Sequence, residues 1–309
     1  MPVGILTRFL CVLYFLTVIG ETEAAQQPPD SVNDTDLRTV EDLLRGYNQG
    51  ELDAARKNIP KRPEPPLATA QPREVMVQGQ VYEDKNANGK RDAGESGLSN
   101  IMVSDGDRVS HTAKDGSYEF KITVLKEPHH RFVTVTRPTG FKSIGPFFGR
   151  IRFDEKQIRY EYDFGFAKDA KSAAREFWFM AASDSQFTAI EQMLPTAKDY
   201  AQLTAAPGEP AFLTTAGDLT MNGTHFEWDM YDHIRQSSKI PVYEGFGGHD
   251  GNILDPRCTV NFEQRIGPPY YSWNYGGVHF IQFITETGYL RNAAQTRQKN
   301  WLKADLEAL

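Results

Sequence analysis

The chain has 309 residues, which is enough for two domains of ordinary size. Its hydrophobic content of 39% and charged content of 24% are typical of a globular protein that buries a core. The formal charge of -7 excludes the clustered basic surface that binding to a phosphate backbone requires, so we expect no nucleic-acid partner.

The first segment, residues 1–24, has the composition of a secretory signal peptide. Arg8 precedes a short apolar run over residues 9–19, and small residues follow at Ala24 and Ala25. The alternative is an uncleaved anchor, but this run is short for a hydrocarbon layer of about 30 Å. We therefore expect a secreted, periplasmic or cell-envelope protein with no stable membrane span after cleavage.

The next segment, residues 25–75, contains many prolines and few apolar residues, which predicts a disordered or Pro-rich linker. The alternative for its middle is one short amphipathic helix, because Leu37, Val40 and Leu44 fall at helical spacing.

Residues 76–166 predict an all-β sandwich domain. Apolar residues alternate with polar ones in several short runs that are separated by Gly, Asp and Pro turns. The longest alternation is Ile158, Tyr160, Tyr162, Phe164 and Phe166.

One loop of this domain has the ligand order of a calcium site. Oxygen-bearing side chains occupy loop positions one, three, five, nine and twelve, with Gly89 at position six for a sharp turn. These candidate Ca²⁺ ligands are Asp84, Asn86, Asn88, Asp92 and Glu95. The alternative is a polar hairpin loop that is rich in Asx turns. The loop and its flanks resemble the Ca²⁺-loop β-sandwich repeats of bacterial surface proteins. They also resemble the prealbumin-like domain that precedes some secreted calcineurin-like phosphoesterases.

Residues 176–309 alternate predicted strands and helices, which indicates an α/β domain. Apolar runs at 177–183, 211–217 and 241–245 predict buried parallel strands, and a hairpin turning at Gly276-Gly277 and a final helix over 293–309 follow. Each of the three runs is followed by candidate site residues, namely Asp184 and Gln186, then Asp218, then His249 and Asp250. Ligands in open α/β sheets bind at such strand ends, so we expect one shared site.

This second domain resembles the calcineurin-like metallophosphoesterases. The resemblance rests on Asp184-Ser185-Gln186, on the stretch from Gly217-Asp218 to Gly223, and on Gly248-His249-Asp250-Gly251. It implies an α/β metallophosphoesterase-like sandwich, two divalent metals of the Fe, Zn or Mn type, and hydrolysis of a phosphate ester by a metal-bound hydroxide.

The resemblance also assigns roles to individual residues. It makes Asp218 the carboxylate shared by both metals and gives Asp184 and Gln186 ligand roles. It makes His249 the group that protonates the leaving oxygen, with Asp250 steadying its ring.

Three departures from the family pattern define the alternatives. Gln186 stands where the family usually has a histidine, and Gly248 stands where it has an asparagine ligand. The family's later histidine ligands come from loops beyond a helix that here ends at Leu309, so the resemblance predicts a C-terminally partial domain. The alternatives are a degenerate phosphoesterase fold that acts as a binding module without metals, and a Ca²⁺-dependent cell-surface attachment protein.

Overall fold

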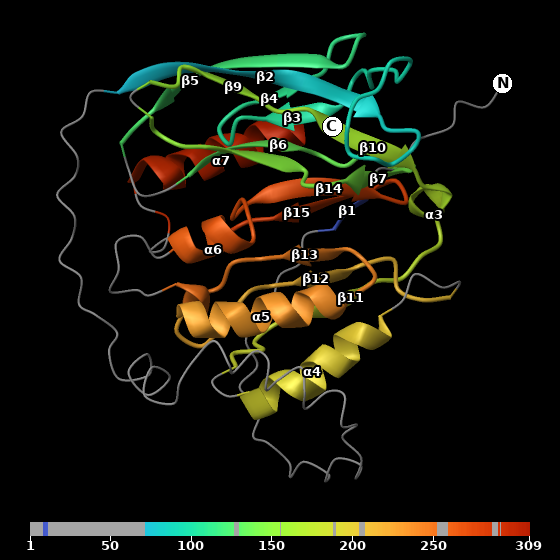
Figure 1. The fold of residues 1–309 in the computed structure, drawn as a ribbon, viewed down its shortest axis with the longest axis vertical. Helices are drawn as coiled ribbons and strands as arrows, with labels where there is room; N and C mark the ends of the chain where they lie inside the picture. Colours follow the sequence, from blue (N-terminus) through green and yellow to red (C-terminus); the bar gives the residue numbers. More distant parts are fainter. Residues whose placement is uncertain are drawn as a thin grey trace.

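The computed structural model describes residues 9–11, 72–126, 130–154, 156–187, 190–203, 208–251, 259–285, 290 and 292–309. Most of the predicted signal peptide and of the predicted linker lies outside these residues. Within them, no helix combines the length and apolar character needed to cross a membrane. The described chain is rich in β-sheet, and its longer helices belong to the C-terminal half (Figure 1).

The N-terminal half contains two packed sheets. One has the strand order β5 (Ser117–Val124), β2 (Arg73–Glu83), β10 (Phe164–Lys168), β7 (Phe141–Ile144), with β9 (Arg159–Glu161) pairing along the first part of β2. The other has the order β4 (Val109–His111), β3 (Met102–Ser104), β6 (Arg131–Val135), β8 (Phe148–Ile151). The β-rich architecture predicted for this region is confirmed.

The alternation along the strands explains the core between these sheets. In β5 every second residue from Tyr118 onward is buried, so one face of the strand packs inward and the other meets water. Val77, Val103 and Val133 are fully buried at the centre of this core. Ile158, which we expected to face inward, is 57% exposed because β9 begins only at Arg159.

The C-terminal half begins with three parallel strands, β11 (Met180–Ala182), β12 (Leu213–Thr215) and β13 (Val242–Glu244), in that order. Helices α4 (Ile190–Gln202) and α5 (His225–Ser237) connect them. The parallel strand predicted within 177–183 is present, but the prediction that the whole run is a buried strand is wrong. Only three residues pair, and Met180 and Ala181 are exposed because β11 is an edge strand with no neighbour on one side within the described residues.

The other sheet of this half is a hairpin of β14 (Tyr271–Tyr275) and β15 (Val278–Gln282), with β1 (Phe9–Cys11) parallel to β15. The predicted turn at Gly276-Gly277 is confirmed. The hairpin lies between the N-terminal sheets and the parallel strands, and α5 and α4 lie beyond the parallel strands (Figure 1). Aromatic side chains fill the space between the hairpin and the parallel sheet, and Tyr243 stacks on Trp273 with 4.1 Å between ring centroids.

The remaining helices of the described chain are α3 (Ala170–Ala173), the 3-10 helix η1 (Gly248–Asp250), α6 (Val260–Arg265) and α7 (Asn292–Glu307). The stretch 167–175, between the two predicted domains, holds the end of β10 and helix α3.

Buried polar contacts join the two halves. Arg137, at the end of β6, donates to the Tyr243 hydroxyl at 2.8 Å and to Asp169 at 3.0 Å. Thr136 contacts Ser272 at 2.9 Å, and Ser272 donates to the buried Asp305 of α7 at 2.8 Å. Such contacts are stabilising only while every partner is present, so the halves are expected to depend on each other.

Candidate metal and phosphoester site

The loop after β11 runs alongside the loop after β12. The backbone N–H of Asp184 donates to the carbonyl of Gly217 at 3.2 Å, and that of Gln186 donates to the carbonyl of Asp218 at 3.1 Å. The parallel register of β11 and β12 continues into these contacts, because Ala182 lies opposite Thr215. The ends of two strands therefore meet at one edge of the sheet, as the sequence predicts.

Asp218 lies at the centre of the candidate site residues. Its Oδ1 accepts a hydrogen bond from the backbone N–H of His249 at 2.9 Å, and its Oδ2 accepts one from Nε2 of Gln186 at 3.3 Å. Asp218 is partly buried, whereas Asp184 and His249 are exposed. The structure thus brings Gln186, Asp218 and His249 together from three different strand ends.

The backbone at these residues is strained. Among the described residues with a side chain, five have a positive φ, and three of the five are Asp184 at 57°, Gln186 at 37° and Asp218 at 54°. Such conformations cost roughly 1 to 3 kcal/mol each and occur most often at functional sites. The other two are Ala87 and Asn100, and Ala87 belongs to the candidate calcium loop.

Two glycines allow the loops after β12 and β13 to touch. A Cβ on Gly247 would lie 2.2 Å from the backbone nitrogen of Asp218 and 2.3 Å from its Oδ1. Gly217 has a φ of 100°, and a Cβ there would lie 2.3 Å from the nitrogen of Gly247. These glycines belong to the site, but the sequence alone does not reveal that Gly247 packs against Asp218.

His249 and Asp250 are not partners of each other in the way the resemblance implies. Nδ1 of the His249 ring lies 2.8 Å from the carbonyl of Met221, which can only accept, so Nδ1 carries the hydrogen. Asp250 is fully buried, and its Oδ1 accepts from the N–H groups of Leu219 at 2.7 Å and Thr220 at 2.8 Å. The backbone carbonyl of Met221 therefore takes the ring-orienting role that we expected from Asp250.

Burial raises the pKa of Asp250 to about 7, and the nearby negative charge of Asp218 adds to the shift. The hydrogen bonds from Gly247, Thr220 and Leu219 oppose it. The four hydrogen bonds that Asp250 accepts favour its ionised form, whereas burial disfavours that form.

The candidate calcium loop follows β2. The fully buried Asp84 accepts from the N–H of Gly89 at 2.8 Å, and Glu95 accepts from the N–H of Lys85 at 2.8 Å and of Asp92 at 3.0 Å. The amides of Asn86 and Asn88 donate to Asp92, at 2.8 Å and 2.7 Å, and these bonds lower the pKa of Asp92. All five predicted ligands therefore belong to one connected loop.

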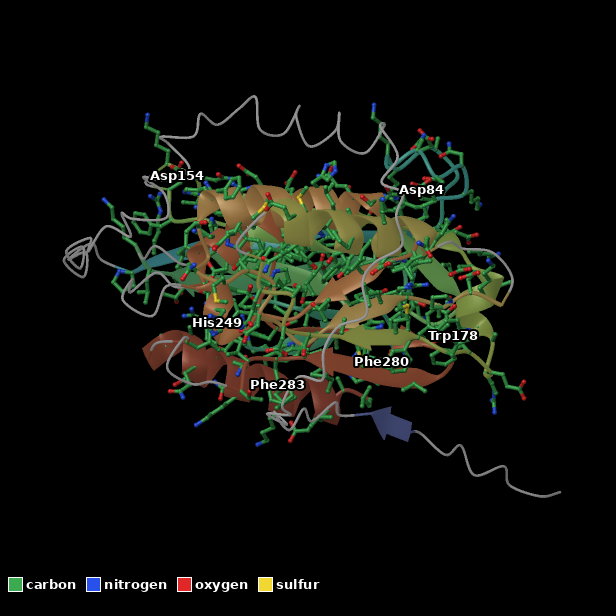
Figure 2. All side chains as sticks on the ribbon, turned by 90° about the horizontal axis from the view of Figure 1, so that it is seen from below. Asp84, Asp154, Trp178, His249, Phe280 and Phe283 are labelled. Carbon is green, nitrogen blue, oxygen red and sulfur yellow. The ribbon has the colours of Figure 1, made fainter. Side chains whose placement is uncertain are left out.

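The loop concentrates negative charge. Burial raises the pKa of Tyr82 to about 12, and the carboxylates of Asp84, Glu95, Asp163 and Asp92 add to that shift. In Figure 2, Asp84 and His249 lie on opposite sides of the molecule. The candidate calcium loop is therefore separate from the residues at the strand ends, Asp184, Gln186, Asp218 and His249, which we call the strand-end group.

Two other histidines have structural roles. His279 is buried, and its ring nitrogens lie 2.6 Å from Asp305 and 2.7 Å from Asn274. His130 is buried against Glu263, at 3.2 Å. The distance in sequence between His130 and Glu263 explains why local pattern missed this pair.

No set of three or more His, Cys, Asp or Glu side chains in the described part of the chain is arranged to hold a metal ion. Asp184, Gln186 and Asp218 together offer two carboxylates and one amide, whose oxygens are all hard donors.

Comparison with known proteins adds little. No family model matches the chain, and no curated protein matches it. Among solved structures, a double mutant of the shaft pilin SpaA from Lactobacillus rhamnosus GG aligns with 7% identity and a TM-score of 0.22. The alignment covers 37% of this chain and 55% of the pilin chain, and a likeness at this level defines neither fold nor function.

Proposed function

We propose that this protein is an exported metal-dependent phosphoesterase whose centre is Asp218. The observation that carries the proposal is the strained backbone at Asp184, Gln186 and Asp218, three residues from two strand ends that lie together. Strain of this kind persists only where the surrounding structure enforces it.

The donor set fits a hard divalent cation, because carboxylate and amide oxygens suit Mg²⁺ or Mn²⁺ better than soft metals. Asp218, Asp184 and Gln186 would hold it. A bound cation supplies Lewis acidity, which polarises the phosphoryl group and activates water. A second cation, as the resemblance implies, would need donors in addition to these three.

The chain's own residues account for substrate handling. His249 is exposed, and the Met221 carbonyl accepts from Nδ1, which leaves Nε2 facing the substrate. In the imidazolium form Nε2 also carries a proton, and this is the proton that the ring gives to the leaving oxygen. Imidazole is suited to such proton transfer near neutral pH. The substrate class is a phosphate ester.

The test is hydrolysis of p-nitrophenyl phosphate with added Mn²⁺, comparing the parent with Asp218→Asn and Asp184→Asn. We expect Mn²⁺-dependent hydrolysis in the parent, its loss in Asp218→Asn, and a partial loss in Asp184→Asn. Equal rates in the parent and Asp218→Asn would refute the assignment. A folded parent that neither binds Mn²⁺ nor hydrolyses would favour the degenerate binding module.

A second candidate function is Ca²⁺-dependent attachment at the cell surface through the N-terminal sandwich. It is favoured by the loop in which Asp84 and Glu95 are buried and bound to backbone amides. Comparing the cell-surface retention of the parent with that of Glu95→Gln, each with and without Ca²⁺, tests this function separately.

A further inference from the structure

Asp250 connects the two loops that carry Asp218 and His249. Its Oδ1 accepts from Leu219 N at 2.7 Å, from Thr220 N at 2.8 Å and from Thr220 Oγ1 at 3.2 Å. Its Oδ2 accepts from Gly247 N at 2.9 Å. One fully buried carboxylate thus binds backbone groups from the ends of both β12 and β13.

The amides it binds are next to the residues of the candidate site. Leu219 directly follows Asp218, whose φ is 54°, and Gly247 comes two positions before His249. The N–H of His249 in turn donates to Asp218 at 2.9 Å. The separation between the Asp218 carboxylate and the His249 ring therefore depends on how these two loops are held.

We propose that Asp250 is a positioning residue that fixes Asp218 and His249 relative to each other by joining the backbones of their loops. This inference rests on the proposed phosphoesterase function, because the two groups it positions are those of that reaction. It replaces the expected role of Asp250 as a partner of the His249 ring.

An acceptor with two oxygens is needed at this point. Without it, the amides of Leu219, Thr220 and Gly247 would face one another as donors in a buried place, which is costly. The Thr220 hydroxyl alone cannot replace the carboxylate, because it also binds Gly223 N at 3.2 Å and the His249 carbonyl at 3.3 Å. The close packing of Gly247 on Asp218 leaves no room for another side chain.

Asp250→Asn removes one of these hydrogen bonds, the one from Gly247 N, and so tests the positioning role of Asp250. The asparagine oxygen can still accept from Leu219 and Thr220, but its NH₂ group would face the N–H of Gly247, so the loop carrying His249 is released. Asp305→Asn is the matched control, because Asp305 is also a buried carboxylate, bound by Ser272 and His279 away from the site. The measurements are Mn²⁺ affinity by titration calorimetry, kcat and KM for p-nitrophenyl phosphate, and the ¹⁵N shifts of the His249 ring.

We expect Asp250→Asn to weaken Mn²⁺ binding by about tenfold or more and to lower kcat with little change in KM, since residues that orient ligands typically have effects of this size. Asp305→Asn should lower the melting temperature but leave Mn²⁺ affinity and kcat at parent values. Unchanged Mn²⁺ affinity, kcat and His249 shifts in folded Asp250→Asn would overturn the inference.

The ¹⁵N measurement separates this inference from the proposed function. If the parent neither binds Mn²⁺ nor hydrolyses the ester, the proposed function fails, and the His249 shifts still report the positioning. The inference is supported if the His249 ¹⁵N shifts differ from those of the parent in Asp250→Asn but not in Asp305→Asn. It is refuted if the two variants have the same His249 ¹⁵N shifts.

Discussion

Replacing Arg137 with methionine should reveal how strongly the two halves depend on each other. The Arg137 side chain is 5% exposed, and its three nitrogens bind Phe141 O at 2.7 Å, the Tyr243 hydroxyl at 2.8 Å and Asp169 at 3.0 Å. Methionine keeps much of the volume but leaves the Asp169 carboxylate and the Tyr243 hydroxyl without these donors. Removing one partner of a buried pair costs about 3 to 5 kcal/mol.

The assay is urea unfolding followed by tryptophan fluorescence and by circular dichroism. We expect Arg137→Met to lower the free energy of unfolding by about 3 to 5 kcal/mol. The control, Lys168→Met, removes a salt bridge to Glu83 whose lysine is 75% exposed, and should cost less than about 1 kcal/mol. A loss in Arg137→Met no larger than that of the control would refute the reasoning.

Three further predictions follow from the two candidate sites. Adding Ca²⁺ to metal-free protein should raise the melting temperature, by an amount that grows with the logarithm of the Ca²⁺ concentration. Glu95→Gln should remove most of this rise. An equal rise of the melting temperature in the parent and in Glu95→Gln would dismiss the calcium loop. Gly217→Ala should destabilise the fold by at least about 2 kcal/mol more than Gly277→Ala. Both glycines have a positive φ, but only a Cβ at position 217 would clash with Gly247. Equal losses of stability in the two variants would contradict this packing. In EDTA, the raised pKa of Asp250 alone should lower the free energy of unfolding by on the order of 4 kcal/mol as pH rises from 3.8 to about 7. The reason is that, over this range, the unfolded chain releases a proton that the folded chain keeps. An identical pH slope in Asp250→Asn would contradict the raised pKa.

The elements with a strong local pattern were predictable. The alternation in β5, the turn at Gly276-Gly277 and the final helix each follow from side-chain period or turn chemistry within a few residues. The edge position of β11 was not predictable, because an apolar run does not say whether a strand has a neighbour on one side or both.

The site residues show the same division. The strand-end position of Asp218 follows from the pattern of apolar runs, whereas the contact of Asp250 with Leu219 and Gly247 depends on how two distant loops pack. The burial of His130 against Glu263 likewise joins residues more than a hundred positions apart. The positive φ of Asp184 and Gln186 could not be predicted from their residue types, because glycine is the residue type that adopts positive φ routinely.

The most direct test is Mn²⁺ binding measured by titration calorimetry in a parent protein that carries Glu95→Gln, because this change removes a ligand of the candidate calcium loop and leaves the strand-end group to be titrated. We expect the parent to bind Mn²⁺ and Asp218→Asn, folded to the same extent, not to bind it. A parent that binds no Mn²⁺, or a variant that binds it equally well, would contradict the account.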